Sequence, residues 1–503
     1  MPNDQVRAND ALKIRTDAAQ AEHDLPLPAH PTNGDESAYP SAFANFTKGL
    51  PHDDTGEVTP AAYALLRKAL DTGLPQDFSA VPLGGGRRFV NPQSGLAFDL
   101  EGADSHHLTI APAPAFKSAR AAGEIVENYW MALARDVSFA DYGTSPIIAQ
   151  AAEDFGKLSD FGGQKLPGLA FRGNLSGDLY GPYVSQFLMK DVAFGAVSID
   201  QRMSTVAPGV DYMKDFPTWL AIQRGQEVTG AAHDPVRRFI RNGRDLGEWV
   251  HVDALYQAYF HACLILLKSG APLDKNNPYL GDGAKNQDGF ATFGGPHLLS
   301  LVTEVATRAL KAVWFQKWFV HRRLRPEAFA ARVHRNLANG ANYPLHADVT
   351  GSKAAAEVFS KHGSYLLPMA FPEGSPLHPA YGAGHATVAG ACVTILKAWF
   401  DESALLEPLV GGPVQASADG LSLVPFTGPG AAELRVGWEL NKLASNVAIG
   451  RNHAGVHWRS DYTASITLGE QVAISVLRDQ KRTYNEPFAG FSLTKFNGET
   501  VII

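Results

Sequence analysis

The sequence predicts a mainly α-helical fold, built as helical bundles with long loops and a few short strands. From about residue 118 onward, apolar residues recur three and four positions apart, which is the spacing of an amphipathic helix. The 503 residues show no regular alternation of strand and helix patterns, no internal repeat and no low-complexity tract. These observations favour helices packed on helices around an apolar core.

The helical spacing predicts a set of long helices along the chain, and short alternating segments such as 197–206 are expected to form small strands. The predicted helices are Glu124–Arg135, Trp249–Leu267, His297–Val320, His385–Phe400, Ala431–Ile449 and Val456–Leu477.

Residues 1–115 differ from the rest, because they are rich in Pro, Gly, Asn and Asp and show only short helical patterns. The clearest pattern is Pro60–Asp71, with proline at a favoured helix start. We predict an extended N-terminal arm (1–115) that packs on the core or on a neighbouring subunit, followed by an α-helical catalytic domain (116–503). Gly84–Arg88 lacks the ending of a phosphate-binding loop and is expected to be a turn. The apolar end, 501–503, is expected to be packed.

Composition limits the possible partners. The net charge of −7 argues against a general binder of nucleic acids or anionic membranes, which needs a basic field. No run approaches the ~20 apolar residues that span a bilayer, and the polar N-terminus lacks a secretory signal. A soluble protein, cytoplasmic by default, is expected. Cys263 and Cys392 stand in apolar runs, where small buried thiols are favoured over a disulfide, which stays open.

The first informative segment is Lys317–Pro326 (KWFVHRRLRP). Helical spacing puts Trp314, Lys317 and His321 on one face. Pro326 disfavours helical geometry at Arg325, so the helix should end there and Arg325 should project from a turn. A lysine and an arginine could then reach one anion from two directions. The alternative is a basic, solvated helix end.

The second segment, His378–His385 (HPAYGAGH), is more specific. Gly384 follows Ala383 directly before an apolar helix, and free N–H groups at a helix start favour anions. His385 would stand at that site as an acid–base group. His378 lies across a loop bent by proline. The alternative is an ordinary glycine loop with a histidine cap.

The third segment, Arg451–His457 (RNHAGVH), repeats this pattern. Arg451 ends one helical run, and Gly455 breaks the chain before the next. We expect His457 in the first turn of the following helix, with Asp461 four residues on, placed to accept the ring N–H. The alternative is a helix-start histidine with a local ion pair. Together the three segments supply what is needed to hold a tetrahedral oxyanion, such as phosphate or vanadate, and to move protons on it.

The order Lys/Arg, Gly-His, Arg/His resembles that of the vanadium-dependent haloperoxidases and their acid-phosphatase relatives. The chain is similar to the bromoperoxidases of red algae and cyanobacteria over almost its whole length. Segments that carry the resemblance are 98–104 (FDLEGAD), 301–311 (LVTEVATRALK), 366–371 (LLPMAF), 388–397 and 440–452.

The resemblance implies roles for the site residues around a vanadate cofactor. Lys317, Arg325 and Arg451 would bind its equatorial oxygens, and the backbone N–H of Gly384 would join them. His457 would bond vanadium directly.

The same resemblance assigns the proton chemistry and the halide side. His385 would hydrogen-bond the apical oxygen and handle protons. His378 matches the second histidine of the bromoperoxidases, and the spacing from Lys317 to Arg325 is theirs, one residue longer than in fungal enzymes and phosphatases. Trp314 should line the halide side.

There is one departure from the family pattern. Ala383 stands where the family has serine, so one hydrogen bond to the anion is lost, a loss on the order of 1 to 3 kcal/mol. In red-algal relatives a further loop binds calcium. Here Tyr279–Gln287 keeps Asp282 but is one residue shorter and carries Lys285, so calcium is not predicted.

The function expected is oxidation of bromide or iodide by hydrogen peroxide to a hypohalous species that halogenates small organic compounds. A phosphohydrolase with His457 as nucleophile is the alternative, and a non-enzymatic helical assembly protein is a second one. His378 and the Lys317–Arg325 spacing favour halide chemistry. The resemblance also implies a homo-oligomer, built from dimers and reaching up to a dodecamer.

Overall fold

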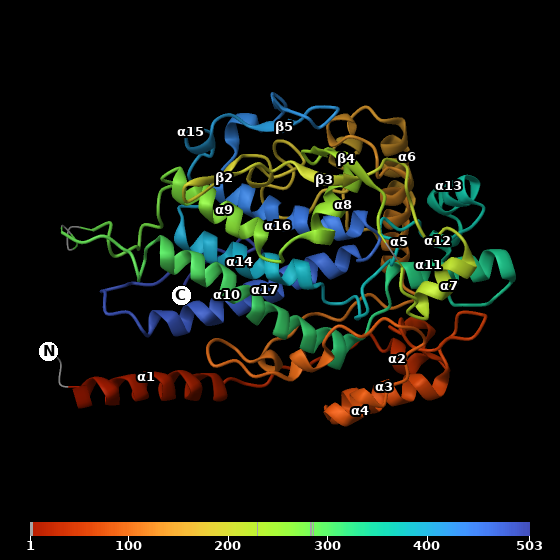
Figure 1. Cartoon of the computed structure of the whole chain (residues 1–503), viewed down its shortest axis with the longest axis horizontal. Coiled ribbons are helices and arrows are strands. Elements are labelled where there is room, and N and C mark those ends of the chain that lie inside the picture. Colours follow the sequence, from red (N-terminus) through yellow and green to blue (C-terminus); the bar gives the residue numbers. More distant parts are fainter. Residues whose placement is uncertain (1–3, 229, 282–283, 285) are drawn as a thin grey trace.

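The computed structural model describes residues 4–228, 230–281, 284 and 286–503. Helices dominate, as predicted. The long helices after the arm form the body of the molecule (Figure 1). They are α5 (Ala119–Leu133), α6 (Pro146–Lys157), α8 (Gly243–Val252), α9 (Gln257–Lys268), α10 (Gly295–Phe315), α11 (Pro326–Asn339), α13 (Lys353–His362), α14 (Gly384–Trp399), α16 (Val436–His453) and α17 (Arg459–Lys481).

The strands are short and form two-stranded antiparallel ribbons at the periphery, as the alternating segments indicate. The pairs are β1 (Val192–Phe194) with β2 (Val197–Ile199), β3 (Met203–Val206) with β4 (His233–Arg238), β5 (Val414–Ala416) with β6 (Leu423–Pro425), and β7 (Ser492–Thr494) with β8 (Thr500–Ile502). The apolar C-terminus is thus ordered as a strand, and Ile503 donates its N–H to the Phe491 carbonyl.

Helix α14 is the centre of the core and packs against α10, α16 and α17. Nearly all of its residues are buried. The backbones of α14 and α17 touch where the two helices cross, because each helix has a glycine at the crossing. A Cβ at Gly390 would overlap the Ile466 carbonyl, and one at Gly469 would overlap the Thr387 carbonyl. Only glycine permits so close an approach.

The N-terminal segment contains α1 (Asp4–His23), α2 (Asp35–Ala38), α3 (Pro60–Thr72) and α4 (Pro75–Ser79). Helix α3 confirms the prediction from Pro60. Helix α1 has no buried residue and runs along the edge of the molecule (Figure 1), whereas residues 45–50 pack into the core. Lys48, for example, is 2% exposed and lies 2.6 Å from the Glu327 carboxylate. The division at residue 115 stays a prediction.

Smaller helices and the cysteines complete the description. Helices α7 (Phe216–Gln223), α12 (Ala347–Thr350) and α15 (Glu407–Val410) join the longer elements. Both cysteines are buried and free, as favoured above. Within the described residues, no single helix is both long and apolar enough to cross a membrane. Helices α8 and α9 meet that test only as a pair bent by 97°.

Candidate active site

The three segments singled out in the sequence converge on one cavity of about 310 Å³. Side chains and backbone from α8–α9, α10, α14, α16 and the chain before α17 form its wall. The lining residues include Trp314, His378, Gly384, His385, Arg451 and His457. Lys317 and Arg325 contact this wall through hydrogen bonds to His378 and His457. The residues predicted from sequence are therefore brought together.

Lys317 lies where α10 gives way to a π-helix, Gln316–His321, so the prediction of one regular helix over 297–320 is wrong at its end. Its Nζ is 2.8 Å from Nδ1 of His378 and 4.6 Å from the Trp314 ring. Trp314 in turn packs 4.9 Å from the His378 ring. His321 does not share this site, because it packs edge-on against Tyr381.

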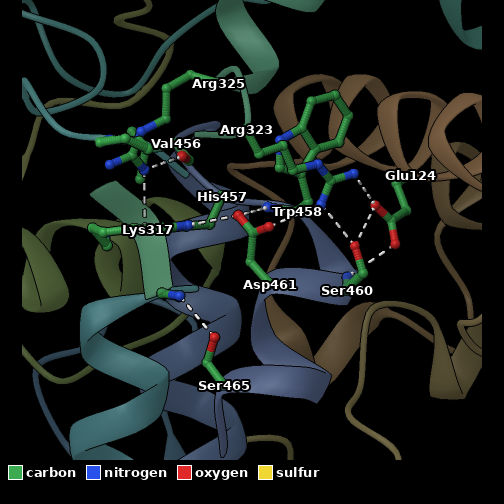
Figure 2. Close-up of polar contacts among 12 residues, drawn as sticks. Glu124, Lys317, Arg323, Arg325, Val456, His457, Trp458, Ser460, Asp461 and Ser465 are labelled. Carbon is green, nitrogen blue, oxygen red and sulfur yellow. Dashed lines mark hydrogen bonds and ion pairs between the residues drawn. The ribbon is translucent and has the colours of Figure 1, made fainter. Parts of the chain in front are cut away.

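Arg325 is the extended residue before Pro326 at the start of α11, as predicted from the proline, but the preceding helix ends at His321 and not at Arg325 as predicted. Its Nε donates to the His378 carbonyl at 3.0 Å, and its NH1 donates to the Val456 carbonyl at 2.7 Å. NH1 also lies 3.0 Å from Nε2 of His457, and NH2 lies 2.9 Å from Nδ1 of His378. The guanidinium is thereby held between the second and third segments. Figure 2 labels Arg325 with Val456 and His457 of the third segment.

Gly384 and His385 open α14, and Ala383 is its N-cap residue without a side-chain cap. The Ala383 N–H donates to the Ser465 hydroxyl at 2.7 Å. At Gly384 an added Cβ would lie 3.2 Å from the Trp314 ring, so the wall is tight here. Burial lowers the pKa of His385, although Asp253 raises it.

Asp253 is a site residue that the sequence analysis missed. Its Oδ1 lies 3.0 Å from Nε2 of His385. The predicted helix Trp249–Leu267 is wrong, since α8 ends at Val252 and α9 begins at Gln257 after a sharp bend. The carboxylate of Asp253 can reach His385 because of this break. An aspartate interrupting an otherwise apolar run was the available signal.

The third segment places Arg451 in the last turn of α16 and His457 just before α17. His457 is therefore outside the helix, not in its first turn, because Trp458 is the N-cap residue. The pairing with Asp461 is nevertheless found: Nδ1 of His457 lies 2.7 Å from Oδ2 of Asp461. Gly455 makes the connection in a left-handed conformation (φ +84°). The Arg451 NH1 donates to the Val250 carbonyl at 2.7 Å.

Three buried cations lie in or against the wall of the cavity. Lys317, Arg325 and Arg451 are 0%, 1% and 6% exposed, and in the described part of the chain none of them forms an ion pair with a carboxylate. Burial lowers the pKa of Arg325 to about 9 and that of Arg451 to about 10. Burial, with the neighbouring arginines, also holds the pKa of Lys317 well below its usual value.

The pKa values of His378 and His457 are shifted by the same neighbouring charges. Burial, followed by the charges of Lys317 and Arg325, holds the pKa of His378 and of His457 well below the ordinary value. Both rings are therefore neutral at neutral pH and can accept hydrogen bonds, as they do here from Lys317 and Arg325. Buried cations without partners are unfavourable unless an anion compensates them. The site is thus suited to an oxyanion.

The donor set also fits the tetrahedral oxyanion in detail. Nε of Arg451 is buried and has no partner among the described residues. Nε2 of His457 is the acceptor nitrogen of the ring, because Nδ1 is engaged by Asp461, and in this structure it accepts from NH1 of Arg325 at 3.0 Å. An oxyanion such as vanadate, which would need several cations and one neutral imidazole, fits the residues present.

These features define a helical-bundle protein with a buried, cation-lined anion site. A family model described as the VCPO second helical-bundle domain matches residues 297–486. The vanadium-dependent bromoperoxidase of Corallina pilulifera is 37% identical, with all of both chains covered. That of Ascophyllum nodosum is 35% identical over 91% of this chain and 86% of its own.

A solved structure agrees with these sequence comparisons. The homohexameric second vanadate-dependent bromoperoxidase of Ascophyllum nodosum superposes with a TM-score of 0.90, at 31% identity, over 98% of this chain and 90% of that chain. The chain belongs to the vanadium-dependent bromoperoxidase family.

The segment 279–287, compared above with the calcium-binding loop of red-algal relatives, is described only in part. Asp282 and Lys285 are not among the described residues. Within the described ranges, no group of three or more His, Cys, Asp or Glu side chains is arranged to hold a metal ion.

Proposed function

We propose that the protein oxidises bromide or iodide with hydrogen peroxide to a hypohalous species that halogenates small organic compounds, using vanadate as cofactor. The observation that carries this proposal is the group of three buried cations, Lys317, Arg325 and Arg451, whose charges act on His457; in the described part of the chain none of them forms an ion pair with a carboxylate. Membership of the bromoperoxidase family supports the choice of halide over phosphate chemistry.

The roles of the residues follow from their chemistry. Lys317, Arg325 and Arg451 would hold the oxygens of the anion, with the Gly384 N–H at the start of α14 as a further donor. His457 would supply the vanadium ligand through Nε2. Vanadate, when bound, supplies a Lewis-acidic centre that activates hydrogen peroxide toward halide.

His385 is the proposed acid–base group. Its Nε2 faces Asp253, so a proton would be given or taken at Nδ1. Asp253 fixes this tautomer, as the carboxylate of a catalytic triad does. His378 accepts from Lys317 and from Arg325, and so keeps both cations aimed at the cavity.

The proposed halide side is the apolar wall formed by Trp314, Leu310 and Leu255. The Trp314 N–H is engaged by the Val90 carbonyl at 2.9 Å, so that the ring presents only its apolar surface to the cavity. An apolar wall beside buried positive charge favours a large, weakly hydrated anion such as bromide or iodide.

The decisive experiment measures bromination of a phenolic dye by protein loaded with orthovanadate, beside cleavage of p-nitrophenyl phosphate. We expect halide- and peroxide-dependent bromination that is lost when orthovanadate is removed by dialysis against a chelator. Phosphate-ester cleavage without bromination would instead support the phosphohydrolase alternative, in which His457 is the nucleophile. Inactivity in both assays would contradict both.

We also infer that the chain forms a homo-oligomer built from dimers. The solved relative named above is a homohexamer, and the exposed apolar residues of the N-terminal arm support self-association. These residues include Val6, Leu12, Leu27, Phe98 and Leu100. Sedimentation velocity of the purified protein tests this.

A further inference from the structure

Arg323 lies behind the cavity and joins three elements of the fold. Its NH1 donates to Oδ1 of Asp461 (2.8 Å) and to the Ser460 hydroxyl (2.7 Å), both in α17. Its NH2 donates to Oε2 of Glu124 in α5 (2.9 Å). Figure 2 shows the guanidinium between the two carboxylates. It also lies 4.4 Å from the Trp458 ring, which limits its movement.

Glu124 completes this network, which we call the Arg323 network (Glu124, Arg323, Ser460 and Asp461). Its Oε1 accepts the Ser460 backbone N–H at 2.9 Å, and its Oε2 accepts the Ser460 hydroxyl at 2.8 Å. Glu124 thus binds the start of α17 as well as Arg323. The three charged residues are between 0% and 3% exposed, so their hydrogen bonds do not compete with solvent.

The network uses both oxygens of Asp461. Oδ1 accepts from Arg323, while Oδ2 accepts from Nδ1 of His457 (2.7 Å) and from the Trp458 backbone N–H (3.1 Å). A carboxylate held at both oxygens cannot turn away from the imidazole. The proton of His457 therefore stays on Nδ1, and Nε2 is the acceptor, which NH1 of Arg325 contacts at 3.0 Å at the cavity wall. Neither Arg323 nor Glu124 lines the cavity, so both act through Asp461.

We propose that Arg323 and Glu124 are positioning residues that fix, through Asp461, which ring nitrogen His457 presents to the bound oxyanion. The identity of that oxyanion rests on the proposed function, whereas the ring geometry does not. Because the network ties α5 to α17, it makes the affinity for the anion depend on a helix that contributes no side chain to the cavity.

Two measurements on protein freed of vanadate test this proposal. Nitrogen-15 NMR of histidine-labelled wild-type protein should show His457 as the Nδ1–H tautomer, and Glu124→Gln and Arg323→Lys should each give mixed tautomers. Titration calorimetry should show orthovanadate and inorganic phosphate binding weakened about 10- to 100-fold in both variants, the usual effect of losing an outer partner of a metal ligand. Glu124→Asp should recover part of this loss.

Glu127→Gln is the matched control. Glu127 is also fully buried on α5 and also binds α17, through Nε of Arg459 at 2.8 Å, but it does not contact Asp461. Glu127→Gln should lower stability as Glu124→Gln does. It should leave the His457 tautomer unchanged and the anion affinity within about twofold, because Glu127 shares no partner with the site.

Several outcomes would overturn the proposal. Wild-type His457 found as the Nε2–H tautomer would do so without any variant, as would Glu124→Gln with wild-type tautomer and affinity. If Glu124→Gln does not fold, Arg323→Lys and the wild-type spectrum decide. Protein that binds orthovanadate with the expected tautomer but does not brominate would refute the proposed function and leave this inference standing.

Discussion

At the scale of single residues, Ala383 stands where the resemblance to the bromoperoxidases implies a serine. It is the N-cap residue of α14, and no side chain caps the first turn there. A hydroxyl at this position would have two possible partners. It could accept an N–H group of the helix start, or it could donate to the oxyanion.

Ala383→Ser should therefore strengthen orthovanadate binding by roughly 10- to 150-fold, because a hydrogen bond to a charged acceptor contributes about 1.5–3 kcal/mol. The free energy of unfolding should rise by about 1 kcal/mol if the hydroxyl caps α14. Calorimetric titration and urea unfolding measure the two effects separately, with Ala383→Gly as the control. A gain in stability without a gain in affinity would show that the hydroxyl serves only the helix.

His251 at the cavity wall gives a pH dependence of stability. Its ring stacks on Phe371 (3.7 Å) and lies 2.7 Å from the Glu373 carboxylate and 3.2 Å from that of Glu248. Burial alone would lower the pKa of His251, but the two glutamates raise it to about 9. The folded-state pKa thus exceeds the unfolded value of about 6.5.

The stability that His251 contributes is complete below about pH 6.5 and is lost as the pH rises through 9. We expect the free energy of unfolding to fall by on the order of 2–3 kcal/mol between pH 6.5 and 9.5. Urea unfolding of wild type and His251→Gln across this range measures the effect. Curves that run parallel for the two proteins would contradict it.

Most of the residues at the site could be predicted because each stands next to a visible break in the chain. Arg325 precedes a proline, Gly384 and His385 open an apolar run, and His457 follows Gly455. Asp253 could not be predicted in the same way. Its contact with His385 depends on the bend between α8 and α9, which brings together residues 132 positions apart.

At the scale of elements, the π-helix Gln316–His321 explains the spacing of the first segment. A π-turn accommodates one residue more than an α-turn and often marks a functional site. The resemblance implies that Lys317 and Arg325 stand one residue further apart than in the fungal and phosphatase pattern, and we infer that the π-turn holds this extra residue.

Deletion of Phe319, which is only partly buried, should restore a regular helix but rotate Lys317 by about 100° relative to Arg325. Orthovanadate affinity should then fall by about 100-fold or more, because one cation leaves the pocket. Circular dichroism and calorimetric titration report fold and affinity. Deletion of Gly412, in a loop before β5, is the length control and should change neither; equal losses in both deletions would refute the prediction.

The long helices themselves were largely predictable, since a spacing of three and four residues persists over many turns. Their ends were less so. The sequence placed the start of the last helix at Val456, whereas α17 begins at Arg459, because the Asp461 side chain accepts the Trp458 N–H and sets the cap. The π-turn gave no sequence signal, since apolar periodicity continues through it.

At the scale of the whole molecule, the arm contributes in two different ways. Residues near Val90 support the cavity through Trp314, whereas α1 buries none of its own side chains. An exposed helix with apolar residues such as Leu12, which is 67% exposed, is expected to find its partner in another copy of the chain.

Removal of residues 1–21 should lower the sedimenting mass while leaving orthovanadate affinity within about twofold, because no contact of α1 reaches the cavity. Removal of residues 1–95, which includes the Val90 contact, is the comparison and should weaken the affinity as well. Unchanged mass after the shorter truncation would show that α1 is not part of the subunit interface.

The crossing of α14 and α17 has a mechanical consequence. His385 stands at the first turn of one helix and His457 just ahead of the other, and the two helices touch main chain to main chain near Gly390 and Gly469. The distance between the two imidazole rings is therefore set by a backbone-to-backbone contact. A methyl group at either glycine would push the two helices apart and so change the distance between His385 and His457.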